Sequence, residues 1–116
     1  MKVFKLKRIL VDMSCTILHH GHIRLLKKAS KLGIVIVGLT TDEEVFKKKG
    51  YWPEISFKYR KEILSSIVYV NEVIPSPWLI TNSYIKKNKI DILVHGHDNS
   101  NKVTNCKIRI FKEQRA

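Results

Sequence analysis

The sequence predicts an α/β fold in which a parallel sheet of about five strands carries helices on both faces. Runs such as residues 34–39 and 90–94 are almost continuously apolar and rich in β-branched side chains, as in strands covered on both faces. The segments between such runs are amphipathic with helical spacing, and this alternation is typical of β-α-β units. With 116 residues, the chain is expected to make one domain, residues 1–116.

The first half of the chain predicts two strands and two helices. A helix is expected from His20 to Leu32, because its apolar residues fall three apart, and Gly33 is expected to end it as a left-handed cap. Thr40, Thr41 and the acids behind them resemble a second helix N-terminus. The remaining elements are buried strands at 9–13 and 34–39 and a basic loop at 47–53.

The second half continues the same alternation. A helix is predicted from Ser56 to about Tyr69, followed by a short strand at 72–74 that Pro75 and Pro77 stop. The other elements are a helix at 79–87 and strands at 90–94 and 108–111. No internal repeat, low-complexity stretch or linker interrupts the pattern, so the predicted sheet is a single Rossmann-like one.

Ligands of an open parallel sheet bind where the strands end and the helices begin. In this chain those places are residues 13–22, 38–42 and 95–99, and all three carry polar side chains. They are therefore the segments in which we expect the functional residues.

A histidine pair stands at the predicted start of the first helix. His19 and His22 are three residues apart and can converge on one point, where backbone N–H groups and the helix dipole already favour an anion. Gly21 leaves room for a phosphate to approach the backbone. The H-x-G-H pattern therefore predicts a phosphate site.

The charge of +12 predicts an anionic partner, which could be nucleic acid, acidic lipid or a phosphorylated small molecule. The lysines are scattered over helix faces and one loop, and the aromatic residues are not interleaved with them, which argues against nucleic acid. No apolar run reaches the roughly 18 residues that cross a membrane. Phosphorylated small molecules remain the preferred partner.

The start of the chain and its cysteines indicate the compartment. Residues 1–8 are charged but have no long apolar stretch behind them, so we expect no signal peptide. Cys15 and Cys106 form no disulfide framework and no C-x-x-C pattern. A cytoplasmic protein is the simplest interpretation.

Five blocks of sequence resemble the nucleotidyltransferase superfamily, and within it the cytidylyltransferases. They follow the family's order over most of the chain, from about Arg8 to Asn99. The blocks are Leu18-His19-His20-Gly21-His22, Thr40-Thr41-Asp42, the segment 53–60 with Arg60, the segment 69–75, and the segment 91–98.

The resemblance implies transfer of CMP from CTP to a small phosphate- or phosphonate-bearing acceptor, with release of pyrophosphate. It also implies Mg²⁺ bound with the nucleotide phosphates, and a homodimer. The implied catalytic residues are His19, His22, Lys49 and Arg60. The implied nucleotide-binding residues are Met13, Ser14, Gly21, Lys48, Gly96, Asp98 and Arg115.

Three departures from the family pattern affect the expected activity. The usual G-T-F-D is replaced by Met13-Ser14-Cys15-Thr16. This Met-Ser opening is similar to that of cytidylyltransferases from phosphonate and surface-polysaccharide pathways. It shifts the expected acceptor away from glycerol phosphate. His97 stands where the family has an aspartate. The family's closing R-x-x-G-I-S-[ST]-[ST] segment is lacking, and Arg115 alone takes the place of its arginine.

Four alternative functions compete with this interpretation. A degenerate family member could keep only a binding role, because the closing segment is lacking, and a basic nucleic-acid-binding domain stays open on charge alone. A zinc site could use His19, His20, His22, His95 and His97, but no acid or thiol lies at a usual ligand spacing, so no metal ligand is assigned. An aminoacyl-tRNA synthetase is excluded by length and by the missing K-M-S-K-S-like segment.

Overall fold

The computed structural model describes residues 6–15, 17–95 and 106–110. Within them, five parallel strands form one sheet in the order β3-β2-β1-β4-β5, which confirms the predicted Rossmann-like α/β fold. In chain order the elements are β1 (Arg8–Met13), α1 (His20–Ser30), β2 (Ile34–Thr40), α2 (Asp42–Lys49), α3 (Phe57–Ser65), β3 (Glu72–Ser76), α4 (Asn82–Lys87), β4 (Ile92–His95) and β5 (Lys107–Ile110).

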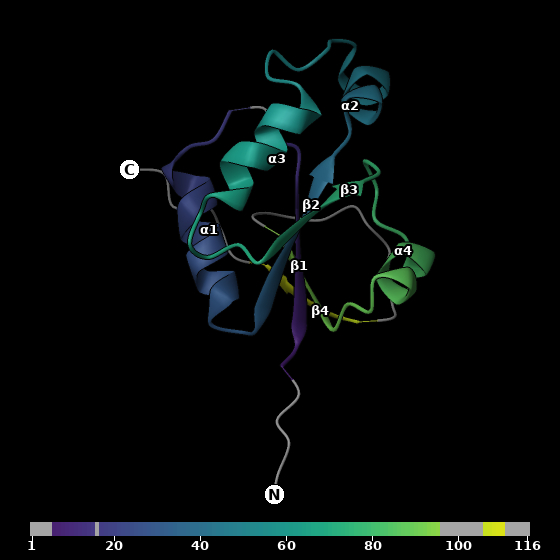
Figure 1. Cartoon of the computed structure of the whole chain (residues 1–116). Helices are drawn as coiled ribbons and strands as arrows, with labels where there is room; N and C mark the ends of the chain where they lie inside the picture. Colours follow the sequence, from purple (N-terminus) through teal and green to yellow (C-terminus); the bar gives the residue numbers. More distant parts are fainter. Residues whose placement is uncertain (1–5, 16, 96–105, 111–116) are drawn as a thin grey trace, which may run out of the picture.

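Helices cover both faces of the sheet because alternate strand residues point to opposite sides. Ile9 and Val11 of β1 pack in one core cluster with residues of α1 and α3, including Leu26 and Leu64. Leu10 packs in the other cluster, which includes residues of α4 and β4. Figure 1 shows α1 and α3 on one side of the sheet and α4 on the other.

The order of strands predicts a ligand-binding crevice at the carboxyl ends of β1 and β4. From β1 the chain moves to β2 and then to β3, and it later crosses to β4 and β5 on the other side of β1. Strand order therefore reverses at β1 and β4, and ligands of such sheets bind at the carboxyl ends of the two strands that flank the reversal. Those ends are Met13 and His95.

Gly33 does not end α1 as a left-handed cap, so that prediction was wrong. α1 ends at Ser30 and its C-cap is Lys31 in the right-handed region, so Gly33 is not a left-handed cap. Instead, a Cβ atom at Gly33 would lie 2.3 Å from the carbonyl oxygen of Lys7. The same oxygen accepts a hydrogen bond from the amide of Ile34, so glycine is needed for close approach of two backbones.

The basic loop predicted at 47–53 was also wrong in part. Lys47, Lys48 and Lys49 form the last turn of α2, and Gly50 ends this helix in the left-handed conformation, with a φ of 80°. Lysines are favourable there because the helix dipole is negative at its C-terminus.

Strand β3 continues past the proline expected to stop it. Pro75 lies opposite Leu39, and the strand ends at Ser76. Proline is tolerated because β3 is an edge strand, where no ladder hydrogen bond is required on the outer side. In the part of the chain that the structure describes, no helix combines the length and apolar character that would let it cross a membrane.

Candidate active site

The two histidines of the H-x-G-H motif build the beginning of α1 between them. His19 is the N-cap, and its Nδ1 accepts a hydrogen bond from the amide of Gly21 at 3.0 Å. In return, Nδ1 of His22 accepts from the amide of His19 at 3.1 Å. This reciprocal arrangement is a capping box in which imidazoles replace the usual serine and glutamate.

The caps fix which ring nitrogen carries the proton. A neutral imidazole whose Nδ1 accepts a hydrogen bond must hold its proton on Nε2, so each ring presents Nε2 as a donor. The ring centroids of His19 and His22 are 4.0 Å apart, and both side chains are half-buried. The structure thus brings together the two residues that the motif predicted.

The local charge makes α1 the better of two helix N-termini for an anion. The first turn of α1 contains no acidic residue, whereas that of α2 contains Asp42, Glu43 and Glu44. Because acidic side chains already occupy the positive end of the α2 dipole, an additional anion is disfavoured there. The first turn of α1 can receive one.

The end of β1 makes an unusual turn toward α1. The carbonyl of Met13 accepts a weak hydrogen bond, 3.4 Å long, from the Thr40 hydroxyl. Ser14 follows, and Cys15 is buried with a φ of 44°, in the left-handed region. Met13 and Ser14 therefore lie where the sequence placed them, at the sheet's ligand edge.

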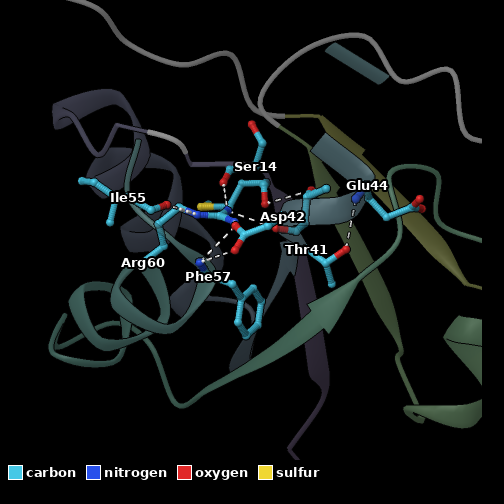
Figure 2. A network of polar contacts seen from close by, with 9 residues as sticks. Ser14, Thr41, Asp42, Glu44, Ile55, Phe57 and Arg60 are labelled. Carbon is cyan, nitrogen blue, oxygen red and sulfur yellow. Dashed lines mark hydrogen bonds and ion pairs between the residues drawn. The ribbon is translucent and has the colours of Figure 1, made fainter. Parts of the chain in front are cut away.

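Arg60, which the resemblance implies as a catalytic residue, is buried in the structure. It is neither a helix-surface arginine nor turned to solvent: the residue is 2% exposed. Its Nε donates to the carbonyl of Ile55, Nη1 donates to the carbonyls of Ser14 and Thr40, and Nη2 pairs with Asp42 at 2.6 Å (Figure 2). Four of the five guanidinium N–H groups thus already have acceptors within the protein, so the geometry favours a structural role over direct contact with a phosphate.

The two candidate lysines lie on the exposed last turn of α2. Lys49 places its Nζ 5.3 Å from the ring centroid of Trp78, in the loop after β3. The same loop is tied to α2, because the amide of Trp78 donates to Glu44 at 3.0 Å. Lys49 is thus directed toward the loop after β3, whereas Lys48 is simply exposed.

A polar pair that the sequence did not reveal lies at the carboxyl ends of β1 and β4. Nδ1 of His95, at the end of β4, is 2.7 Å from Oδ1 of Asp12, near the end of β1, and the side chains are only 8% and 18% exposed. The orientation is not that of a hydrogen bond, and His95 Nε2 has no hydrogen-bond partner among the described residues. The sequence alone could not predict this pair, because the two strand ends become neighbours only through the order of the strands in the sheet.

The remaining candidates lie outside the described residues: Gly96, His97, Asp98 and Arg115. The Mg²⁺ that the resemblance implies, bound with the nucleotide phosphates, stays a prediction. Within residues 6–15, 17–95 and 106–110, no three histidine, cysteine, aspartate or glutamate side chains gather as metal ligands.

Comparison with known proteins identifies the family to which this chain is similar. A family model described as "Cytidylyltransferase-like" matches residues 16–115. Glycerol-3-phosphate cytidylyltransferase of Staphylococcus aureus is 38% identical over 97 residues, covering 80% of this chain and 71% of that protein. Ethanolamine-phosphate cytidylyltransferase of Mus musculus is 34% identical over 96 residues, covering 81% of this chain but 24% of that larger protein.

Two further proteins widen the comparison. FAD synthase of Pyrococcus abyssi is 42% identical over 93 residues, covering 78% of this chain and 63% of that protein. A lipopolysaccharide core biosynthesis protein from Thermoplasma volcanium has the same fold, with a TM-score of 0.81 at 22% identity, over 96% of this chain and 100% of that one. The family model and the relatives together show that this chain belongs to the cytidylyltransferase-like family of nucleotidyltransferases.

Proposed function

We propose that this protein transfers CMP from CTP to a small phosphate- or phosphonate-bearing acceptor and releases pyrophosphate. The observation that carries the proposal is the capping box of His19 and His22, which presents two Nε2 donors at a helix N-terminus without acidic residues. Relatives named for cytidylyl transfer to glycerol 3-phosphate and to ethanolamine phosphate support it.

The reaction needs positioning and charge stabilisation more than covalent catalysis by the protein. An oxygen of the acceptor phosphate attacks the α-phosphorus of CTP in line. The new phosphorus–oxygen bond forms as the bond from the α-phosphorus to the bridging oxygen breaks, and pyrophosphate leaves with that electron pair. His19 and His22 would donate to phosphate oxygens on which negative charge increases, and Lys49 or Lys48 would neutralise the pyrophosphate.

The Mg²⁺ expected with the nucleotide would be held mainly by phosphate oxygens. This ion commonly takes only one or two carboxylates from a protein and keeps water or phosphate as its other ligands. Asp12 is the described carboxylate nearest the crevice, but His95 already lies against it. We therefore propose that Mg²⁺ arrives with CTP and adds charge neutralisation there.

The decisive experiment separates the imidazoles from their capping role. His19→Asn keeps an N-cap acceptor, and His22→Gln keeps the acceptor of a capping box, yet both remove the Nε2 donor. Each variant should retain its thermal stability and lose about two or more orders of magnitude in turnover, as when an oxyanion donor is removed. His20→Asn is the matched control, because His20 is exposed and has no part in the capping box.

Pyrophosphate release should be measured with CTP and ATP against glycerol 3-phosphate, ethanolamine phosphate and 2-aminoethylphosphonate. ATP belongs in the screen because one relative is named FAD synthase. Turnover of His19→Asn and His22→Gln equal to that of the unchanged protein would refute the proposed roles. Binding of CTP without turnover with any acceptor would instead favour the degenerate member that only binds.

We also propose a cytoplasmic homodimer. Val68 is 87% exposed and Ile63 is 40% exposed, on the last turn of α3 and just beyond it, and a partner subunit would cover such side chains. Light scattering coupled to size exclusion should give twice the mass of one chain. Val68→Asp should then yield the monomer.

A further inference from the structure

The turn from β1 to α1 contains a conformation that an L-residue rarely adopts. Cys15 has a φ of 44°, although it is neither a glycine nor an asparagine. The only other described non-glycine residue with positive φ is Lys89, in the turn between α4 and β4. Strained backbone persists only where the surrounding structure enforces it.

Arg60 contacts the peptide group directly before Cys15. Its Nη1 donates to the carbonyl of that group, on Ser14, at 2.6 Å. The same nitrogen donates to the carbonyl of Thr40 at 3.0 Å, at the end of the neighbouring strand β2. The guanidinium therefore fixes the carbonyl of Ser14 relative to the rigid sheet.

Asp42 in turn fixes Arg60. Its carboxylate lies 2.6 Å from Nη2 of Arg60 and accepts from the amide of Phe57 at 3.0 and 3.1 Å, through its two oxygens. Figure 2 shows these contacts converging on the guanidinium from Ser14, Ile55 and Asp42. The ammonium of a lysine is a single point and could not reproduce this planar fork.

We propose that Arg60 is a positioning residue: by holding the Ser14 carbonyl, it keeps Cys15 left-handed and so directs the chain from β1 into the capping box of His19. This inference rests on the proposed function and assigns Arg60 no contact with substrate. It predicts that loss of the fork lets Cys15 relax and moves the phosphate-binding backbone, and that a glycine at position 15 compensates.

The test compares Arg60→Lys, Cys15→Gly and the double variant Arg60→Lys/Cys15→Gly. Kinetics with CTP are measured beside direct titration with CTP and with inorganic pyrophosphate, and thermal stability is recorded separately. Arg60→Lys should raise the KM and Kd for CTP about tenfold or more, because misplaced binding groups lose this much readily. The double variant should recover most of that loss, since glycine adopts positive φ without a Cβ penalty.

Two controls separate positioning from general stability. Arg8→Lys alters another partly buried arginine, which donates to the carbonyl of Asn88 at the opposite end of the sheet, and should leave the KM for CTP unchanged. Lys89→Gly relaxes the other positive φ and should likewise leave it unchanged. If Arg60→Lys does not fold, Cys15→Val tests the same geometry with Arg60 intact, because a β-branched residue resists this conformation; it should weaken CTP binding.

The outcomes are distinct. Absence of rescue by Cys15→Gly, or unchanged CTP binding in Cys15→Val, overturns the positioning role even when the unchanged protein transfers CMP. If the protein without substitutions binds CTP but transfers CMP to no acceptor, the proposed function alone is refuted. The titrations with CTP then still decide the role of Arg60. An unchanged protein that binds neither CTP nor pyrophosphate overturns both.

Discussion

The contribution of the Asp12–His95 pair to stability can be measured by mutation. Replacing His95 with Phe removes the imidazole and leaves the carboxylate of Asp12 largely buried, since the side chain is 18% exposed. Leaving a buried polar group without its neighbouring polar partner costs about 1–3 kcal/mol, so we expect a loss of about 2 kcal/mol. For a domain of this size, that corresponds to a fall in Tm of roughly 6–12 °C.

The double variant Asp12→Leu/His95→Phe should be much less damaging than His95→Phe alone. Replacing both partners with apolar groups of similar size is nearly neutral, because no unpaired charge is left behind. Urea unfolding of the four proteins at pH 7, followed by tryptophan fluorescence, gives the coupling free energy, which we expect at about 1–3 kcal/mol.

The pair Arg8–Glu72 is the matched control for this cycle. Its atoms are 3.7 Å apart and its side chains are 33% and 53% exposed, so solvent screens the attraction. Its coupling should be at most about 1 kcal/mol. A coupling for Asp12–His95 that is as small as the control would refute the argument that these residues form a buried, interacting pair.

Two further predictions concern the glycines and Tyr84. Gly33→Ala should lower the free energy of unfolding by about 1–3 kcal/mol, because the new Cβ overlaps a backbone carbonyl. Gly50→Ala should lower it by only about 1 kcal/mol, the penalty of the left-handed conformation, because no atom lies within 4 Å of the new Cβ. Equal melting temperatures of the two variants would contradict this difference. Burial raises the pKa of Tyr84 to about 12, with a smaller rise from the charge of Asp12 against a lowering by the hydrogen bond to Ser76. Because the folded pKa lies above the ordinary value of 10.0, this phenol's contribution to stability should be lost as pH rises from 10.0 to about 12. Tyr84→Phe should flatten the alkaline fall in Tm, and an unaltered slope would oppose it.

Local sequence signals were sufficient for the strands and for the histidine pair. The β-branched runs needed only burial on both faces to become β2 and β4, and the capping box of α1 joins residues three apart. Gly50 could also have been found, since a basic last turn followed by glycine is a common helix end.

Other features depend on contacts between distant segments, which a local pattern does not contain. The burial of Arg60 exists only because β1, β2 and the chain before α3 meet around it. The need for glycine at position 33 arises from Lys7, and the pairing of Asp12 with His95 requires the strand order. Each of these became visible only when the chain was folded.

The contacts of Asp42 limit how the lysines of α2 can reach a bound nucleotide. Since this first residue of α2 is bonded both to Arg60 and to the first amide of α3, the helix is anchored at its beginning and cannot swing there as a rigid lid. Its far end stops at Gly50, whose φ is 80° and around which a side chain would meet nothing. Lys48 and Lys49 lie on the anchored side of this glycine, so they should reach bound phosphates by extending their own long side chains and not by a swing of α2.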